Sequence, residues 1–180
     1  MKRSIPHWQI VGFLFTSVLG TFLHFLFDLT HDNILAGLFS AVNESIWEHT
    51  KLLFYPIVLF AILEYFVWGK HRNNFWCIKL IGTLTGLILI PTLYYTYTGI
   101  SGISSHWVNI AIFFFAAGFV FYLETKLFQL DFPCPVSTIA AIACLFSIAV
   151  LYTVFTFYPL HFPFFKDPLT GNYGYQNSPL

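Results

Sequence analysis

Five apolar segments, each long enough to cross the hydrocarbon core of a bilayer, most constrain what this chain can fold into. They lie at roughly 8–30, 43–69, 75–98, 107–126 and 135–158. Because a helix rises about 1.5 Å per residue, about 20 residues cover the roughly 30 Å of hydrocarbon. Only 9% of the 180 residues are charged, whereas a soluble domain carries roughly a quarter. The sequence therefore predicts an all-α integral membrane protein, a bundle of about five transmembrane helices.

The segments between and after these spans predict a simple organisation. Residues 1–158 form one transmembrane helical domain, and residues 31–42 are too short to span, so we expect an outer loop or a short surface helix there. Residues 159–180 are rich in proline and glycine, and the DPLTG stretch at 167–171 has strong turn chemistry. We expect a structured extracytoplasmic tail, able to act as a lid through His161, Asp167 and Tyr173.

Basic residues near the ends of the spans predict the orientation. With five spans, two basic residues fall on the side of the C-terminal tail, Lys51 and Lys166, and six fall on the other: Lys2, Arg3, Lys70, Arg72, Lys79 and Lys126. The positive-inside rule then places the N-terminus in the cytoplasm and the tail outside the plasma membrane. A net charge of zero gives no argument for a nucleic-acid partner, and the lipid bilayer is the expected partner.

The cysteines suggest no cross-linked framework. Cys77, Cys134 and Cys144 form no CxxC pair and are odd in number. We expect neither a zinc ribbon nor a disulfide scaffold.

Polar side chains gather at one predicted depth near the outer surface. His24 and Asp28 are spaced i, i+4 near the end of the first span, and Glu44 and Glu48 have the same spacing at the start of the second, beside His49. A short loop joins these two spans, so we expect antiparallel neighbours with these side chains facing each other. Ionisable groups at membrane depth normally face a bundle interior or a water-filled cavity. The pattern predicts an outward-facing polar pocket, whose other members are Asn43, Ser45, Lys51, Tyr97 and His106.

This pocket has the chemistry of a metal or cation site. Imidazole nitrogens and carboxylate oxygens bind Zn²⁺ and other divalent cations. We expect four ligands, His24, Asp28, Glu48 and His49, with Glu44 and Glu48 as the candidate catalytic carboxylates. A simpler interpretation of NESIWEH is a helix start, in which Asn43 caps the helix and Glu44 and Glu48 suit its positive end.

Three functions stay open from these residues. Water activated by a metal would support hydrolysis or transfer on a lipid-borne substrate. Alternatively, the same carboxylates serve a proton or ion site in a small transporter or channel subunit, which at this length would be a homo-oligomer; Glu64 and Lys79 then form an inner relay rather than a structural ion pair. A third hypothesis is that the protein binds a lipid or other small molecule, or that it has a purely structural role in the membrane.

Three stretches resemble a known family. HFLFDL at 24–29, GLFSAVNESIWEHTKLLFYP at 37–56 and FYPLHFPFFKDPLTGNYG at 157–174 are similar to a family of uncharacterised small bacterial multi-pass membrane proteins, a domain of unknown function with a V-N-E-S-x-W-E-H-x-K-L core and a D-P-x-T-G-x-Y-G tail. The resemblance covers most of the chain. It implies a multi-pass fold and no particular activity.

Overall fold

The computed structural model describes residues 5–176, and its regular structure is helical throughout. Five long helices are each long and apolar enough to cross a membrane: α1 (Ile5–Leu29), α3 (Ile46–Val67), α4 (Phe75–Ser101), α5 (His106–Gln129) and α6 (Thr138–Phe157). A short α-helix, α2 (Ile34–Gly37), follows α1, a 3₁₀ turn, η1 (Gly69–His71), follows α3, and a second 3₁₀ turn, η2 (Pro163–Phe165), lies in the tail after α6. The expectation of an all-α multi-pass bundle with a short helix after the first span is confirmed.

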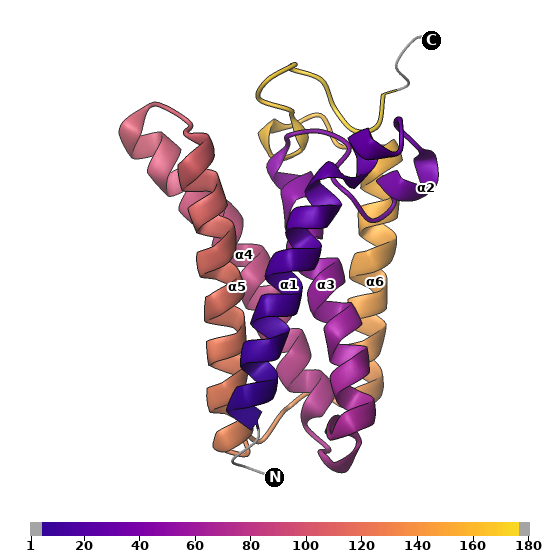
Figure 1. Cartoon of the computed structure of the whole chain (residues 1–180), viewed down its shortest axis with the longest axis vertical. Coiled ribbons are helices and arrows are strands. Elements are labelled where there is room, and N and C mark those ends of the chain that lie inside the picture. Colours follow the sequence, from indigo (N-terminus) through magenta and orange to yellow (C-terminus); the bar gives the residue numbers. More distant parts are fainter. Residues whose placement is uncertain (1–4, 177–180) are drawn as a thin grey trace.

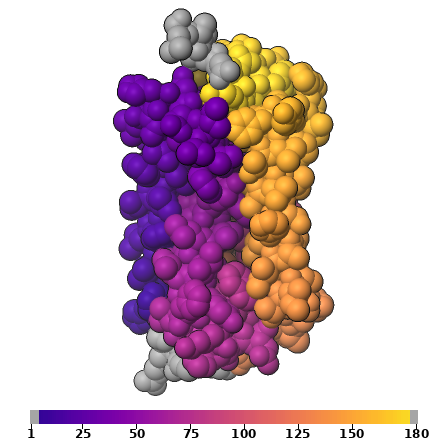
Figure 2. All heavy atoms as spheres, turned by 90° about the vertical axis from the view of Figure 1, so that its right-hand side faces the viewer, coloured from indigo at the N-terminus to yellow at the C-terminus, as the bar shows by residue number. Residues whose placement is uncertain are grey.

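The long helices run side by side along the long axis of the molecule (Figure 1). One end of the bundle, here called the basic end, holds the start of α1, η1 and the loop between α5 and α6. The other, the tail end, holds α2 and the C-terminal segment, and the two lie against each other there (Figure 2). α1, α3, α4 and α5 form the central group, α6 packs outside it on α4 and α3, and the tail-end halves of α4 and α5 lean away from the other helices.

A close approach of α1 to α3 fixes how these two helices meet. A side-chain carbon at Gly20 would lie 2.6 Å from the carbonyl oxygen of Leu52, so only glycine fits there. This carbonyl is also the one that Pro56 leaves without an intrahelical donor, because proline has no N–H. The helices are antiparallel, so residues one turn beyond Gly20 on α1 face residues one turn before Leu52 on α3. That register brings His24 opposite His49.

The start of α3 differs from the prediction that the span begins at 43. Ser45 is the N-cap, and its side chain accepts a hydrogen bond from the backbone N–H of Glu48. Asn43, the predicted cap, instead accepts from the N–H of Ser45 in a local turn. Glu44 therefore lies before the helix, not on its surface.

The cysteines depart from the sequence-based expectation of no disulfide scaffold. A disulfide joins Cys77, near the start of α4, to Cys134 in the loop between α5 and α6, whereas Cys144 is free. The pairing holds this loop against α4 at the basic end. It was not foreseeable from spacing, because the two residues are 57 positions apart. Because disulfides are rare in the cytosol, this pair argues against the prediction that the basic end faces the cytoplasm. The orientation of the chain in the membrane stays a prediction.

Candidate functional site

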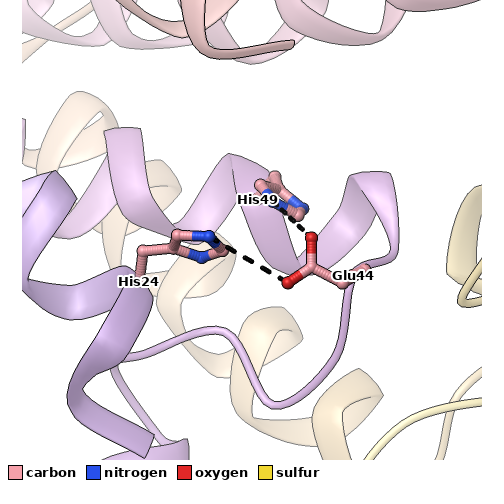
Figure 3. Close-up of side chains that lie close together, drawn as sticks. All are labelled: His24, Glu44 and His49. Atoms are coloured by element: carbon pink, nitrogen blue, oxygen red, sulfur yellow. Dashed lines mark ion pairs between the residues drawn. The ribbon is translucent and has the colours of Figure 1, made fainter. Parts of the chain in front are cut away.

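Three side chains from α1 and the start of α3 converge at the tail end: His24, Glu44 and His49 (Figure 3). The Glu44 carboxylate lies between the two imidazoles, with one oxygen 4.0 Å from Nε2 of His24 and the other 3.4 Å from Nε2 of His49. Among the described residues, this is the one group whose ligand-type atoms all lie within 4.8 Å of one another. The side chains are partly exposed, at 22%, 37% and 28%, so solvent reaches the site.

The local backbone sets the orientation of His49. Its Nδ1 lies 2.9 Å from the carbonyl oxygen of Ser45, one turn earlier. A carbonyl only accepts, so Nδ1 carries the hydrogen, and the lone pair of the neutral ring is on Nε2, facing Glu44. Proteins usually orient a metal-binding histidine in this way, by a hydrogen bond from the ring nitrogen that does not bind the metal. Nδ1 of His24 is buried and has no hydrogen-bond partner among residues 5–176.

The spacing of these atoms suits a small divalent cation. Zinc binds imidazole nitrogen and carboxylate oxygen at about 2.0–2.2 Å, so two ligands of a tetrahedral ion lie roughly 3.3 Å apart. The 3.4 Å separation of His49 and Glu44 matches that value, and the 4.0 Å separation of His24 and Glu44 needs a small side-chain rotation. Two histidines and one glutamate are also a ligand set of catalytic zinc, in which the fourth position stays open for water.

Glu48 lies elsewhere, although the sequence predicts it as both a ligand and a catalytic residue. Its carboxylate is 2.5 Å from the ammonium of Lys51 and accepts from the hydroxyl of Thr156 on α6 and from the N–H of Val42. Lys51 also donates to the carbonyl of Gly37 and to Thr156. Both charged side chains are completely buried. Because consecutive residues on a helix point about 100° apart, Glu48 faces α2 and α6 while His49 faces α1.

This buried network and the tail hold the segment that carries Glu44. Val42 is fixed through its bond to Glu48, and the side-chain amide of Asn43 donates to the carbonyl of Gly174 at 3.0 Å. Gly174 has φ +61°, and a side chain there would meet the carbonyl of Thr156 at 2.7 Å. The chain on both sides of Glu44 is therefore anchored, on one side to the tail and on the other to the Ser45 cap.

The remaining predicted pocket residues lie around this group without joining it. Asp28 and His106 interact electrostatically with His24, but neither belongs to the three-residue group. Asp28 lines a separate hollow of about 200 Å³ beneath the tail. Tyr97 accepts a hydrogen bond from the backbone of Ser105 and so closes the turn between α4 and α5.

The tail is folded by the residues proposed as a lid. Asp167 is buried, and its carboxylate accepts from the N–H of Leu169 and the hydroxyl of Thr170, so it forms the turn that its sequence predicts. The rings of His161 and Tyr173 pack against each other at a tilt of 41°, with centroids 4.8 Å apart. These contacts are within the tail, and the tail's link to the Glu44 segment is made by Gly174.

A second polar group lies inside the bundle near the basic end. The ammonium of Lys79 is 2.5 Å from the Glu64 carboxylate, as the predicted inner ion pair requires, and 2.6 Å from that of Glu124. Gln9 donates to the other oxygen of Glu64 at 2.7 Å. Gln9 and Glu124 were missed in the sequence, although Glu124 falls inside an apolar span at the depth of Lys79 and intramembrane carboxylates usually have partners.

Comparison with known proteins identifies the family. The model of a family of unknown function, DUF6512, matches residues 1–175, so the chain belongs to this family, as the resemblance in its sequence indicated. Searches of curated proteins and of solved structures returned no match.

Proposed function

We propose that this member of the DUF6512 family binds a divalent metal ion, of the zinc type, through His24, Glu44 and His49. The observation that carries the proposal is that nitrogen and oxygen atoms of three side chains converge within 4.8 Å in a solvent-accessible position. The charges fit as well, since two neutral imidazoles and one carboxylate leave a divalent ion with net positive charge. Such an ion lowers the pKa of bound water to near neutrality.

The chemistry that follows is hydrolysis or group transfer on a lipid-borne substrate at the tail-end membrane surface. Three protein ligands leave a coordination position for water, and they lie in the last two turns of α1, in the segment just before α3 and in the first turn of α3. A substrate carried by a lipid would reach this depth from the bilayer. In this assignment Glu44 is a metal ligand, and Glu48 and Lys51 support the segment that carries it.

The test is elemental analysis of protein purified without chelator. We expect about one zinc or similar ion per chain in the wild type and less than a tenth of that in His49→Ala. His161→Ala, which removes a histidine at the same end of the molecule, is the matched control and should keep its metal. Wild-type protein that holds no metal, and acquires none on addition of Zn²⁺, would refute the proposal.

A second function, a proton- or ion-coupled transporter, is suggested by the presence of two polar groups at opposite ends of one helical core. The Lys79 group and the His24 group lie on the same four-helix core, and Gln9 and His24 are 15 positions apart, or about 22 Å along α1. Completely buried apolar side chains fill the core between them, among them Leu53, Ile57 and Val120. Transport would require this layer to open. Reconstituted vesicles in which ion flux is unaffected by Glu64→Gln and Glu44→Gln would exclude the role.

A further inference from the structure

The group formed by Glu64, Lys79 and Glu124, here called the inner triad, contains two acidic side chains and one basic one. Each carboxylate approaches the same ammonium within 2.6 Å, and the three side chains are at most 1% exposed. They come from three helices, α3, α4 and α5. If all three groups were ionised, the triad would carry one uncompensated negative charge in the interior of the bundle.

Among residues 5–176, no other charged side chain pairs with the triad to compensate this charge. α1 contributes Gln9, which is neutral and donates to Glu64. Arg72, in the loop that precedes α4, pairs with Asp131 and also donates to the carbonyl of Phe128. Within residues 5–176, Lys79 is thus the one cation paired with these two carboxylates. A buried charge without a partner is strongly unfavourable, so a group in this position takes up or loses a proton instead.

Aromatic rings surround the triad and separate it from water. The Lys79 ammonium lies 5.5–5.9 Å from the ring centroids of Phe60, Phe75, Phe121 and Phe128. Phe75 and Phe128 are one turn from Lys79 and Glu124 towards the basic end, and Phe60 and Phe121 are about one turn from Glu64 and Glu124 towards the tail end. The electron-rich faces of these rings stabilise the ammonium, but they do not stabilise a second negative charge.

The two carboxylates are not equivalent. Glu64 accepts a hydrogen bond from Gln9 through one oxygen, and its other oxygen, Oε2, forms an ion pair with Lys79 at 2.5 Å without a hydrogen bond. Glu124 is bonded to Lys79 through one oxygen only, and its other oxygen, Oε1, is buried without a hydrogen-bond partner among the described residues. This oxygen lies where a side chain at Gly82 would be, 2.5 Å from the position of its missing carbon. The small residue makes room for it.

We infer that the inner triad is a proton-binding site, in which Glu124 holds one proton on Oε1 and Glu64 and Lys79 form the ion pair. With this proton bound the triad is neutral. Two carboxyl groups that share one site normally ionise one at a time, because the first negative charge opposes the second. The site lies apart from the proposed metal ligands, so this inference is independent of the proposed metal binding.

Infrared spectroscopy tests this by counting protonated carboxyl groups. The C=O stretch of a buried carboxylic acid is separate from that of a carboxylate and shifts when the proton is exchanged for deuterium. The charge balance predicts one such group in the wild type at neutral pH. It predicts none in Glu124→Gln or in Glu64→Gln, since the single carboxylate left then ionises to balance Lys79, and two in Lys79→Met. Glu44→Gln, at the solvent-accessible site, is the control and should leave the band unchanged.

Stability supplies a second readout if Lys79→Met does not fold. Either single glutamine variant leaves a carboxylate for Lys79 and should melt near the wild type. Glu64→Gln combined with Glu124→Gln leaves the ammonium unpaired, so it should melt well below both. A wild-type spectrum without the acid band, or a band that survives in Glu64→Gln and Glu124→Gln, would overturn the inference. So would a double variant as stable as the single ones.

Discussion

Two charged groups at the start of α3 lie within a few residues of each other and have opposite characters. Glu48 and Lys51 are sealed inside the bundle, and each of Glu48's oxygens has partners from the protein. Glu44 is 37% exposed and is approached by two imidazoles, and it accepts no hydrogen bond from any described residue. The partners of the first group all come from the protein, whereas the second group leaves its carboxylate open to solvent and to a further partner.

The inner triad extends the comparison to the other end of the bundle. It is as deeply buried as the Glu48–Lys51 pair, but it has two carboxylates for one ammonium. One additional proton completes the triad, whereas the Glu48–Lys51 pair is neutral as it stands. A buried polar group must be balanced in charge and in hydrogen bonds, and the way in which it falls short of balance indicates what it binds.

The largest expected effect comes from the sealed pair. Glu48→Ala leaves the Lys51 ammonium buried without its carboxylate and removes the bonds to Val42 and Thr156. We expect a loss of about 3–5 kcal/mol in the free energy of unfolding, which is typical of breaking a buried ion pair. Glu44→Ala, four residues away and partly exposed, should cost less than about 1 kcal/mol. Unfolding of both variants in detergent measures the contrast, and similar losses would mean that Glu48 is not the structural member.

Metal binding should depend on Glu44 and not on Asp28, the other carboxylate near His24. Glu44→Ala removes a carboxylate from between the two imidazoles, so we expect Zn²⁺ affinity to fall by at least about 100-fold, more than the loss of an outer-shell partner causes. Asp28→Ala is the matched control, because Asp28 was the carboxylate predicted beside His24 and the structure leaves it outside the group. Its affinity should stay within a few-fold of wild type. Titration against a chromogenic chelator measures both, and a large effect of Asp28→Ala would restore the original ligand assignment.

Hydropathy and helical spacing predicted much of this molecule. The five spans, the short element after the first and the pairing of His24 with His49 all follow from segment length, period and a short loop. The exchange of Glu44 and Glu48 could not be predicted in the same way. It depends on where α3 begins, and a shift from Asn43 to Ser45 as the cap takes Glu44 off the helix surface. Gln9, Glu124 and Thr156 lie far in the sequence from their partners, and the disulfide between Cys77 and Cys134 likewise depends on tertiary packing.

Replacing Gly174 tests whether the tail is anchored to the bundle at this residue and so contributes to the stability of the fold. Alanine at this position meets a positive φ and the carbonyl of Thr156, so we expect a loss of about 1–3 kcal/mol in stability. Gly99, on α4, has open space where its side chain would be. Gly99→Ala should therefore be neutral or gain up to about 1 kcal/mol, because alanine favours the helix. Melting temperatures of the two variants decide the matter, and equal values would show that the tail is not anchored at Gly174.

The smallest expected effect concerns the link between the tail and the segment that carries Glu44. Asn43 links the tail to the residue that precedes Glu44, so Asn43→Ala should loosen that carboxylate and weaken Zn²⁺ binding about tenfold, the lower range for a residue that orients a ligand. Asn172→Ala changes an exposed asparagine of the tail and should have no effect. Asn43→Asp separates the two bonds, because the carboxylate still accepts from the N–H of Ser45 but no longer donates to Gly174. An affinity of Asn43→Asp equal to wild type would assign the orientation of Glu44 to the local turn alone, and an affinity as low as that of Asn43→Ala would assign it to the tail.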